Sequence, residues 1–407
     1  MSEISTKGKL VLGLQHILAM FGATVLVPFL TGMNPSIALL SAGVGTLIFH
    51  FCTKRIVPVF LGSSFAFISA IALVLRDSGI GAVKGGIIAA GLVYVFVSRI
   101  VKIYGVEKVK SFFPPVVVGP TIVVIGLRLS PTALSMAGYT NGHFDTHSLI
   151  VSGVVVLSMV FISVLGKSFF KLVPILISVV LGYFVAMALG MVDFTPIKEA
   201  SWIGLSPDAL HSLTTMPEFS LTSILAIAPI AFVVFIEHIG DITTNGAVVG
   251  KDFFANPGIS RTLLGDGCAT IVAGLLGGPA NTTYGENTGV LAVTKVYDPA
   301  ILRIAAVYAI ILAFIGKFGV ILQTIPTPVM GGISIILFGM IASVGMRTLI
   351  EAKLDFSHSR NLIISSLILV LGIGIDNMVI WRTVSLSGLA IAALCGVILN
   401  KIFPENM

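Results

Sequence analysis

The sequence predicts an all-α polytopic membrane protein of about fourteen transmembrane spans, arranged as two inverted repeats of seven. Of its 407 residues, 56% are hydrophobic and only 10% are charged, whereas a soluble protein carries about 25% charged residues. Apolar stretches long enough to cross a bilayer follow one another with short connections. Short motifs of the first half of the chain also recur in the second half at a nearly constant distance.

This composition excludes a soluble enzyme, a nucleic-acid-binding protein and a disordered protein. The formal net charge is +6, but the basic residues stand singly or in pairs between apolar runs and form no basic patch. The cysteines Cys52, Cys268 and Cys395 have neither the spacing of a disulfide framework nor that of a metal site. We therefore expect no metal, no cofactor and no nucleic-acid partner.

Each helical span requires about 20 mostly apolar residues. The first candidate resembles a signal peptide, but it is too long and lacks a small-residue cleavage site, so we expect a retained helix. The expected spans lie near residues 10–31, 36–53, 57–75, 82–101, 114–128, 148–166, 169–192, 222–241, 261–278, 281–294, 298–316, 328–346, 360–375 and 386–403.

The distribution of Lys and Arg indicates the orientation. If the N-terminus is cytoplasmic and every span crosses, 18 of the 24 basic residues fall in cytoplasmic segments. A wrong span count would distribute the basic residues more evenly between the two sides of the membrane. We therefore expect a protein of the cytoplasmic membrane with both termini inside. The longest polar stretch, residues 193–221, is too short to form a separate domain.

The repeats are inverted because an odd number of spans separates them. Gln-His-Ile at 15–17 recurs 222 residues later as Glu-His-Ile at 237–239, and Gly-Val-Gly at 43–45 recurs at the same distance as Gly-Asp-Gly at 265–267. Each copy lies seven spans further along the chain than its motif, and because seven is odd the copy enters the membrane from the other side. Inverted repeats are typical of secondary transporters, whose sites lie near the midplane where the repeats meet.

Two spans are interrupted at corresponding places. The segment 57–64 contains proline, glycine and β-branched residues before a short helical run from Phe65, and the segment 277–285 precedes a similar run from Glu286. Non-helical backbone at this depth must be buried in protein or line a cavity. We expect both half-helices to direct free amides and positive dipole ends at one point, which suits carbonyl or anionic acceptors on a small ligand.

Four carboxylates lie within apolar spans: Glu237, Asp241, Asp266 and Glu286. No Lys or Arg is expected at comparable depth near them. Unpaired carboxylates in a membrane are costly and are functional candidates by default. Desolvation and mutual repulsion favour their neutral forms, so protons, sodium ions or an N–H-rich ligand are the natural partners.

The four carboxylates differ in what the sequence predicts. Glu237 and Asp241 share one helix face; Glu237 corresponds to Gln15 in the repeat and is expected to be functional, whereas Asp241 could equally be solvated at a helix end. Glu286 could stabilise its own helix dipole, but a functional role is favoured at the midplane. Asp266, between two glycines, is expected to serve packing or hydrogen bonding.

Other polar residues in the spans can be explained by structural roles. His16 and His238 are expected to form interhelical hydrogen bonds, and His50 is expected near the membrane interface. For Ser63 and Ser64, hydrogen bonding to freed backbone groups and contact with a substrate are equally favoured.

The stretch Glu286-Asn287-Thr288-Gly289, followed by Thr294-Lys295, resembles the signature of the nucleobase/ascorbate transporter family, also called nucleobase cation symporter 2. Gln15-His16 and Glu237 also match that family. The similarity covers essentially the whole chain, and residues 19–28 (Ala-Met-Phe-Gly-Ala-Thr-Val-Leu-Val-Pro) resemble the bacterial uracil permease branch in particular.

The resemblance implies a fold of seven plus seven inverted spans, with short β-strands in spans 3 and 10. It implies a core domain of about residues 8–104 and 222–318, and a gate domain of about 112–195 and 326–404. The core would move against the gate, often within a homodimer.

The resemblance also implies a substrate site and a coupling ion. Glu237 would accept the coupling proton, with Asp241 and His16 as further candidates. Phe338 would form an apolar wall on the gate side. The residues implied to bind the base are, in full, Glu237, Glu286, Phe65, Ser64, Tyr284, Gly285 and Phe338.

The expected function is uracil import by proton symport through alternating access. Uracil offers two N–H donors and two carbonyl acceptors on a flat ring. Carboxylates suit the donors, half-helix amides suit the acceptors, and aromatic faces suit the ring. The alternatives are a xanthine or purine permease of the same family and an anion transporter of similar architecture. The latter predicts a basic residue at the midplane. An intramembrane enzyme is disfavoured because its metal, paired-Asp or nucleophile motifs are missing, and a passive channel fits broken helices less well.

Overall fold

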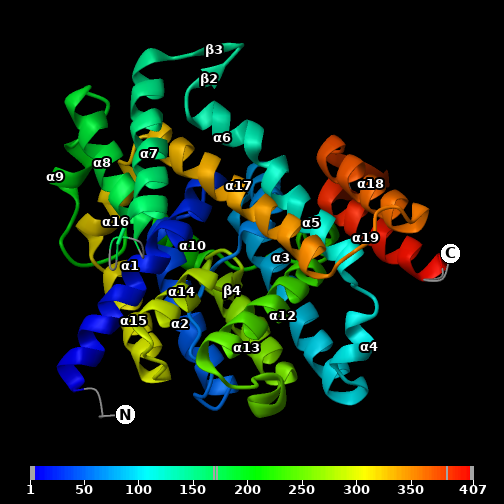
Figure 1. Cartoon of the computed structure of the whole chain (residues 1–407). Helices are drawn as coiled ribbons and strands as arrows, with labels where there is room; N and C mark the ends of the chain where they lie inside the picture. The colour runs from blue at the N-terminus through cyan, green and yellow to red at the C-terminus, as the bar shows by residue number, and fades with distance from the viewer. Residues whose placement is uncertain (1–4, 168–169, 171–172, 382–383, 404–407) are drawn as a thin grey trace.

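The computed structural model describes residues 5–167, 170, 173–381 and 384–403. Within them, eight helices are long and apolar enough to cross a membrane, or nine if one sharply bent pair counts as a single span. The chain is thus a mostly helical, multi-pass membrane protein (Figure 1). The count of fourteen spans stays a prediction.

The elements follow the expected spans closely. The longer helices are α1 Thr6–Thr31, α2 Pro35–Cys52, α3 Ile68–Tyr104, α5 Pro115–Arg128, α7 Thr146–Leu165, α8 Pro174–Ala188, α12 Ile230–Val249, α13 Ile259–Leu276, α15 Pro299–Ala313, α17 Thr327–Glu351, α18 Ser359–Gly374 and α19 Gly388–Ile402. The shorter helices are α4 Val106–Lys110, α6 Ser130–Met136, α9 Thr195–Glu199, α10 Pro207–Thr214, α11 Leu221–Ile227, α14 Gly285–Thr294 and α16 Gly316–Gln323. The strands are β1 Leu61–Ser63, β2 Tyr139–Thr140, β3 His143–Phe144, β4 Asn281–Thr283, β5 Asn377–Trp381 and β6 Val384–Ser387.

Three expected boundaries need comment. Element α3 includes the helical parts of the third and fourth expected spans and is bent at Gly79, whose φ of 78° is non-helical. The eighth expected span was to end at residue 241, but α12 continues to Val249. Residues 169, 171 and 172 of the seventh expected span lie outside the described residues.

The eleventh expected span, 298–316, corresponds to α15, and a second short helix, α16, begins at its last residue. Helices α15 and α16 meet at an angle of 82°. The break is stabilised by backbone hydrogen bonds from Gly204 N to Phe314 O (2.9 Å) and from Gly316 N to Trp202 O (3.1 Å). The polar connection before α11 therefore supplies the partners that let the helix bend.

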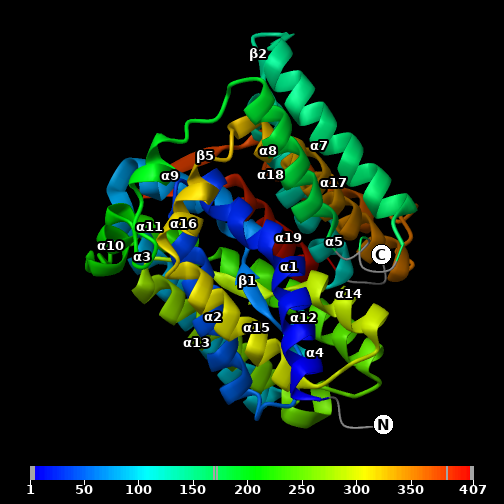
Figure 2. The same ribbon diagram turned by 90° about the vertical axis from the view of Figure 1, so that its left-hand side faces the viewer.

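The helices pack in two groups (Figure 2). In the first group, α13 packs against α2 and α3, and α15 packs against α1 and α2. In the second group, α17 packs against α5 and α7, and α18 packs against α5 and α19. Helices α1 and α12 lie where the groups meet, because α1 also contacts α8 and α17, and α12 also contacts α5 and α19.

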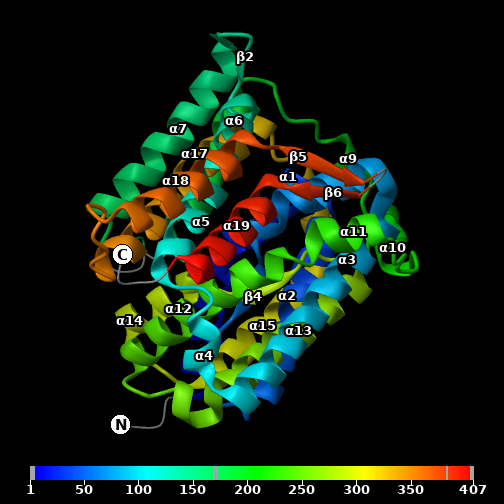
Figure 3. The same ribbon diagram turned by 90° about the vertical axis from the view of Figure 1, so that its right-hand side faces the viewer.

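A two-stranded antiparallel sheet joins the two halves of the chain inside the first group. Strand β1 pairs with β4 in the register Leu61 with Thr283, Gly62 with Thr282 and Ser63 with Asn281, and all of these residues are buried. Figure 3 shows β4 among the helices of this group. The expected strand in each interrupted span is therefore present, and the two strands bring their flanking half-helices together.

Close helix packing around this sheet depends on glycine. A Cβ on Gly45 would overlap the Nδ2 atom of Asn281 in β4, and a Cβ on Gly265 would lie 2.7 Å from the ring of Phe49. Helix α2 can approach β4 and α13 this closely because these positions carry no side chain.

A buried lysine anchors the polar connection before α11 to the helices. Lys84 in α3 is only 1% exposed. Its Nζ donates hydrogen bonds to the carbonyls of Ser212 (2.9 Å), Leu213 (3.2 Å) and Thr215 (2.6 Å). These carbonyls lie at the C-terminal end of α10, where a helix leaves unpaired acceptors and where a positive charge is favourable.

Replacing Lys84 with methionine is expected to lower the stability of the purified protein by about 1–3 kcal/mol, because three carbonyls lose a charged donor. Denaturant unfolding in detergent would measure this loss. The matched control is Lys198→Met, an exposed lysine in α9 of the same connection, which should change stability by less than about 0.5 kcal/mol. Equal losses in both variants would contradict the anchoring role.

Candidate functional site

The two half-helices begin side by side at the β1–β4 sheet. A short 3₁₀ turn, Phe65–Phe67, leads from β1 into α3, and α14 starts immediately after β4. The residues before them, Ser64 and Tyr284, make no side-chain hydrogen bond that would cap either helix start. The first amides of both helices therefore remain available to acceptor groups of a ligand.

The backbone of the interrupted segments is satisfied mainly by side chains from neighbouring helices. This accounts for how non-helical chain is tolerated at this depth. The contacts are Leu61 N to Thr46 Oγ1 (2.9 Å), Asn245 Nδ2 to Pro58 O (3.1 Å), Thr270 Oγ1 to Asn281 O (3.0 Å) and His50 Nε2 with Val59 O (2.9 Å). In the other direction, the side chain of Asn281 donates to Ser41 O in α2 (2.9 Å).

Apart from His50, these supporting residues were not singled out by sequence reasoning. His50, which was expected near the membrane interface, lies in the last turn of α2, is 1% exposed and contacts the β1 segment. A polar side chain that faces a chain interruption gives no periodic signal. The one signal in the sequence that could have indicated these contacts was the presence of polar residues in apolar spans of a chain that also has interrupted spans.

Three of the expected carboxylates gather around the helix starts. Glu237 and Asp241 lie one turn apart on α12, and Glu286 lies in the first turn of α14. All three keep partial exposure, whereas many of their neighbours are buried. Glu237 lies within electrostatic range of Glu286, and Asp241 lies within range of both glutamates. The arrangement is an acidic, partly accessible surface next to free amides.

Asp241 is connected to the sheet. Its Oδ2 accepts a hydrogen bond from Thr283 Oγ1 at 2.6 Å. Since α12 extends two turns past it, to Val249, Asp241 is not a solvated residue at a helix end. The interpretation in which it merely faces water at the interface is wrong.

A cavity of about 210 Å³ opens beside Glu286 and Gly289. Its other walls come from α1 (Leu18, Ala19), α7 (Met159, Ser163), the start of α8 and α17 (Leu337, Met340). Glu286 is the one ionisable residue in its lining. The cavity lies between the first and second helix groups, so a small polar molecule in it would contact both.

Two aromatic residues expected at the site also come together across the groups. Phe338 in α17 is 1% exposed and packs in one cluster with Val27 and Ile68, and Phe65 packs against the same cluster. Phe338 thus forms part of an apolar wall beside the start of α3. Its ring is covered by protein in this conformation.

Tyr284 and Ser64 are buried in the sheet region. The Tyr284 hydroxyl donates to the carbonyl of Ser63 at 2.9 Å, and a Cβ on Gly62 would overlap the Tyr284 ring. The hydroxyl of Ser64 is buried without a protein partner among the described residues. The Tyr284 hydroxyl therefore links the end of β4 to β1, whereas the Ser64 hydroxyl has no hydrogen-bond partner among the described residues and lies near the helix starts.

His16 is held by the residue that follows Glu286. Asn287 Nδ2 lies 3.0 Å from His16 O and 3.1 Å from His16 Nδ1. A backbone carbonyl can only accept, so this contact fixes the amide nitrogen of Asn287 toward His16, and Nδ1 is the acceptor. His16 therefore connects α1 to α14 as a neutral ring, in line with the expected interhelical hydrogen bond.

The remaining carboxylate, Asp266, lies apart from this surface. It is fully buried on α13, and its Oδ2 is 2.8 Å from Nδ1 of His238. The expected role of Asp266 in helix packing or hydrogen bonding stays a prediction, since the contact with His238 is at ion-pair distance. Within the described ranges, no three His, Cys, Asp or Glu side chains are grouped so as to hold a metal ion.

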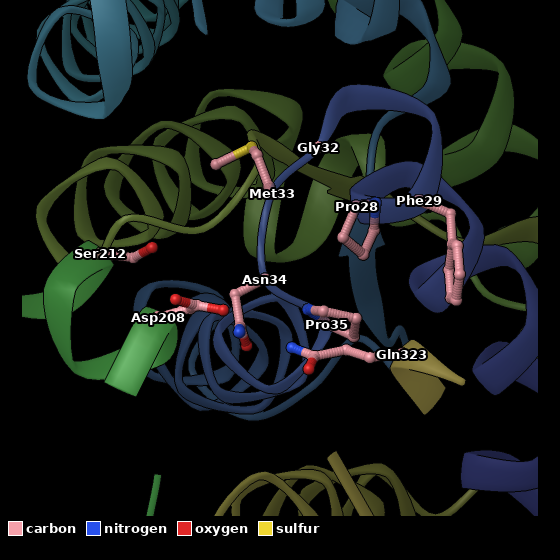
Figure 4. Close-up of a pocket in the computed structure, with 9 residues that line it drawn as sticks. All are labelled: Pro28, Phe29, Gly32, Met33, Asn34, Pro35, Asp208, Ser212 and Gln323. Atoms are coloured by element: carbon pink, nitrogen blue, oxygen red, sulfur yellow. The ribbon is translucent and has the colours of Figure 1, made fainter. Parts of the chain in front are cut away.

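Two other cavities contain none of the expected site residues. One, of about 300 Å³, lies where α1 ends and α2 begins, and Figure 4 shows Asn34, Asp208 and Gln323 along it. The other, of about 400 Å³, is mostly apolar and lies between α5 and α12. Of the expected site residues, Glu286 alone lines one of these three cavities, the cavity of about 210 Å³.

Comparisons with known proteins agree with this geometry. A family model described as "Permease family" matches residues 7–379. A "Probable uracil permease" of Haemophilus influenzae is 46% identical over 394 residues, covering 97% of this chain and 94% of the relative. A "Uracil permease" of Bacillus caldolyticus is 47% identical over 397 residues, covering 97% and 91%.

The chain belongs to the nucleobase/ascorbate transporter family. Members of this family are permeases, proteins that move a solute rather than convert it, and this chain is not an enzyme. Among solved structures, the transmembrane domain of the cyanobacterial bicarbonate transporter BicA is similar to it, with a TM-score of 0.65. That likeness covers 95% of this chain and 97% of BicA at 18% sequence identity, so it concerns the fold alone.

Proposed function

We propose that this permease imports uracil by proton symport. The observation that carries the proposal is the pairing of β1 with β4, which brings two uncapped helix starts next to Glu237 and Glu286. The carboxylates match the N–H donors of uracil, and the free amides of Phe65 and Gly285 match its carbonyls. The names of its relatives, at 46% and 47% identity, support the same substrate.

The apolar part of the site comes from both helix groups. Phe65 and Phe338 would enclose the flat ring, with Ser64 and Tyr284 completing the wall behind it. Tyr284 already uses its hydroxyl hydrogen on Ser63, so its contribution to the ligand is mainly its ring and its position. Ser64 is the hydroxyl that remains available.

Transport would proceed by alternating access between the two groups. The first group corresponds to the core inferred from the sequence and the second to the gate, and the cavity beside Glu286 is lined by both. Movement of one group against the other would open this cavity to alternate sides. The orientation with both termini in the cytoplasm and the homodimer belong to the same proposal.

The coupling proton is assigned to Glu237. It is partly accessible, lies within electrostatic range of Glu286 and Asp266, and has no basic partner among the described residues. Asp241 is the second candidate, although it already accepts a hydrogen bond from Thr283. His16 is a weaker candidate because a proton on its Nδ1 would face the amide nitrogen of Asn287.

An anion transporter is disfavoured by the placement of positive charge. Its substrate would need a basic residue at the site, whereas the fully buried lysine, Lys84, directs its ammonium to three carbonyls near α10. A xanthine or purine permease would use the same carboxylates and amides. Substrate competition, rather than geometry, distinguishes that alternative.

Uptake of labelled uracil into proteoliposomes tests the proposal directly. We expect accumulation that requires an inward proton gradient, collapses with a protonophore and is unaffected by excess xanthine. Uptake blocked by xanthine would move the substrate to the purine branch. Equilibration without accumulation under the gradient would contradict proton coupling.

A further inference from the structure

The pair formed by His238 and Asp266 is the only histidine–carboxylate pair without any solvent exposure among the described residues. The Nδ1 atom of His238 lies 2.8 Å from Oδ2 of Asp266, and both side chains are 0% exposed. These two atoms are at ion-pair distance, although they are not aligned as in a straight hydrogen bond. No other described residue donates a hydrogen bond to Asp266.

The contacts of Thr262 assign a hydrogen to the other nitrogen of His238. Nε2 lies 2.9 Å from Oγ1 of Thr262. That hydroxyl already donates its single hydrogen to the carbonyl of Ile259, at 2.9 Å. Since Thr262 can only accept from the ring, His238 is protonated on Nε2.

The geometry on the Nδ1 side requires a second hydrogen. Without one, two atoms that both carry lone pairs would lie 2.8 Å apart. Asp266 would then be a buried negative charge with no partner, which is among the most unfavourable arrangements in a protein interior. A proton on either Nδ1 or Oδ2 removes both problems and leaves the pair with no net charge.

The neighbouring charges reinforce this requirement. On α12, Glu237 lies within electrostatic range of Asp266, and Asp241 lies within range of His238. On α3, the buried hydroxyl of Tyr94 lies within range of both Asp266 and Glu237 and has no hydrogen-bond partner among the described residues. Loss of the proton would add a negative charge beside existing acids.

We propose that His238 and Asp266 form a proton-binding site that retains one proton from pH 5 to pH 9 and stays electrically neutral. The site is separate from the partly exposed carboxylates Glu237, Asp241 and Glu286. It holds α12 against α13 directly next to Glu237, without contributing a charge that would alter the behaviour of that glutamate. The inference depends on the short distance between Nδ1 and Oδ2 and on the burial of both side chains, and not on which substrate is transported.

The test counts protons by linkage. At pH 5–9 an unfolded chain has an ionised Asp266, so the folded wild-type protein holds one proton that the folded Asp266→Asn variant lacks. In the variant, the introduced amide can donate to the neutral His238 ring, so the neighbouring groups keep the same surroundings. We therefore expect the unfolding constant of the wild type, relative to the variant, to rise about tenfold for each unit of pH.

Unfolding of the full-length protein in mixed detergent micelles would be followed at several pH values from 5 to 9. The control is Asp193→Asn, an exposed aspartate whose Oδ1 accepts a hydrogen bond from Thr195 N and which is ionised in both states, so the wild-type-to-control ratio should not vary with pH. If the wild-type-to-Asp266→Asn ratio is also constant, the pair holds no proton and the proposal is wrong. A slope that vanishes within the range would equally contradict retention.

The slope does not depend on how much stability the substitution removes. Asp266→Ser should therefore give the same tenfold change per pH unit and replaces the first variant if Asp266→Asn fails to fold. A merely structural contact without a retained proton would lower stability in both variants by an amount that is independent of pH.

Discussion

Glu286→Gln is expected to weaken uracil binding by about 10- to 100-fold. Glu286 is the ionisable residue of the cavity between the two helix groups, and its carboxylate accepts hydrogen bonds only. Glutamine places one oxygen and one amide nitrogen there, so one N–H of uracil would meet a donor instead of an acceptor. Loss of a hydrogen bond to a charged group costs about 1.5–3 kcal/mol, which corresponds to that range of affinities.

Binding of labelled uracil to the purified variant would measure the effect, with unfolding in detergent as a check that the protein remains folded. Glu351→Gln is a suitable control because Glu351 is exposed and pairs with Arg347, at 3.2 Å, on the surface of α17. Unchanged affinity in Glu286→Gln would remove this residue from the site. A loss in the Glu351 control would point to a general effect of charge.

Glu237→Gln is expected to retain measurable uracil binding but to abolish gradient-driven accumulation. Glutamine imitates the protonated form of the glutamate, so the variant stays permanently in the state that the wild type reaches by binding a proton. Substrate could still equilibrate across the membrane, whereas the proton gradient would no longer do work on it. Internal uracil should then not exceed the external concentration.

Proteoliposome uptake with and without a pH gradient measures this separation of binding from coupling. Asp241→Asn is the informative comparison, because Asp241 lies one turn away and within electrostatic range of Glu237. If accumulation survives in Glu237→Gln and is lost in Asp241→Asn, the proton belongs to Asp241. Loss of binding itself in Glu237→Gln would mean that the charge serves the substrate rather than the coupling.

The parts of the fold that the sequence predicted are those that depend on the composition of short segments. Apolar runs located the longer helices, and prolines and glycines before Phe65 and Glu286 located both interruptions. Acidic residues in apolar surroundings are conspicuous because few of them are tolerated there. Glu237 and Glu286 therefore stood out as candidates, and the two interrupted segments are the ones that meet as β1 and β4.

The parts that escaped prediction depend on contacts across the fold. The polar run from Asp241 to Asn245 resembled the end of a span, yet α12 continues because these side chains have internal partners. Asn245 bonds to Pro58 O and Thr288, and Thr243 bonds back to Ile239 O. A hydropathy window counts such residues as exposed, because it cannot register a partner nearly two hundred positions away.

The pairing of β1 with β4 also limits the order in which the protein can be assembled. During synthesis, Leu61–Ser63 enters the membrane long before Asn281–Thr283 exists, and its strand partner is more than two hundred residues away. Backbone groups without partners are unfavourable in a lipid environment. The amino-terminal half must therefore wait in an unfinished, partly hydrated form until the second strand leaves the ribosome, which makes docking of the two halves a late step of biogenesis and a vulnerable point for quality control.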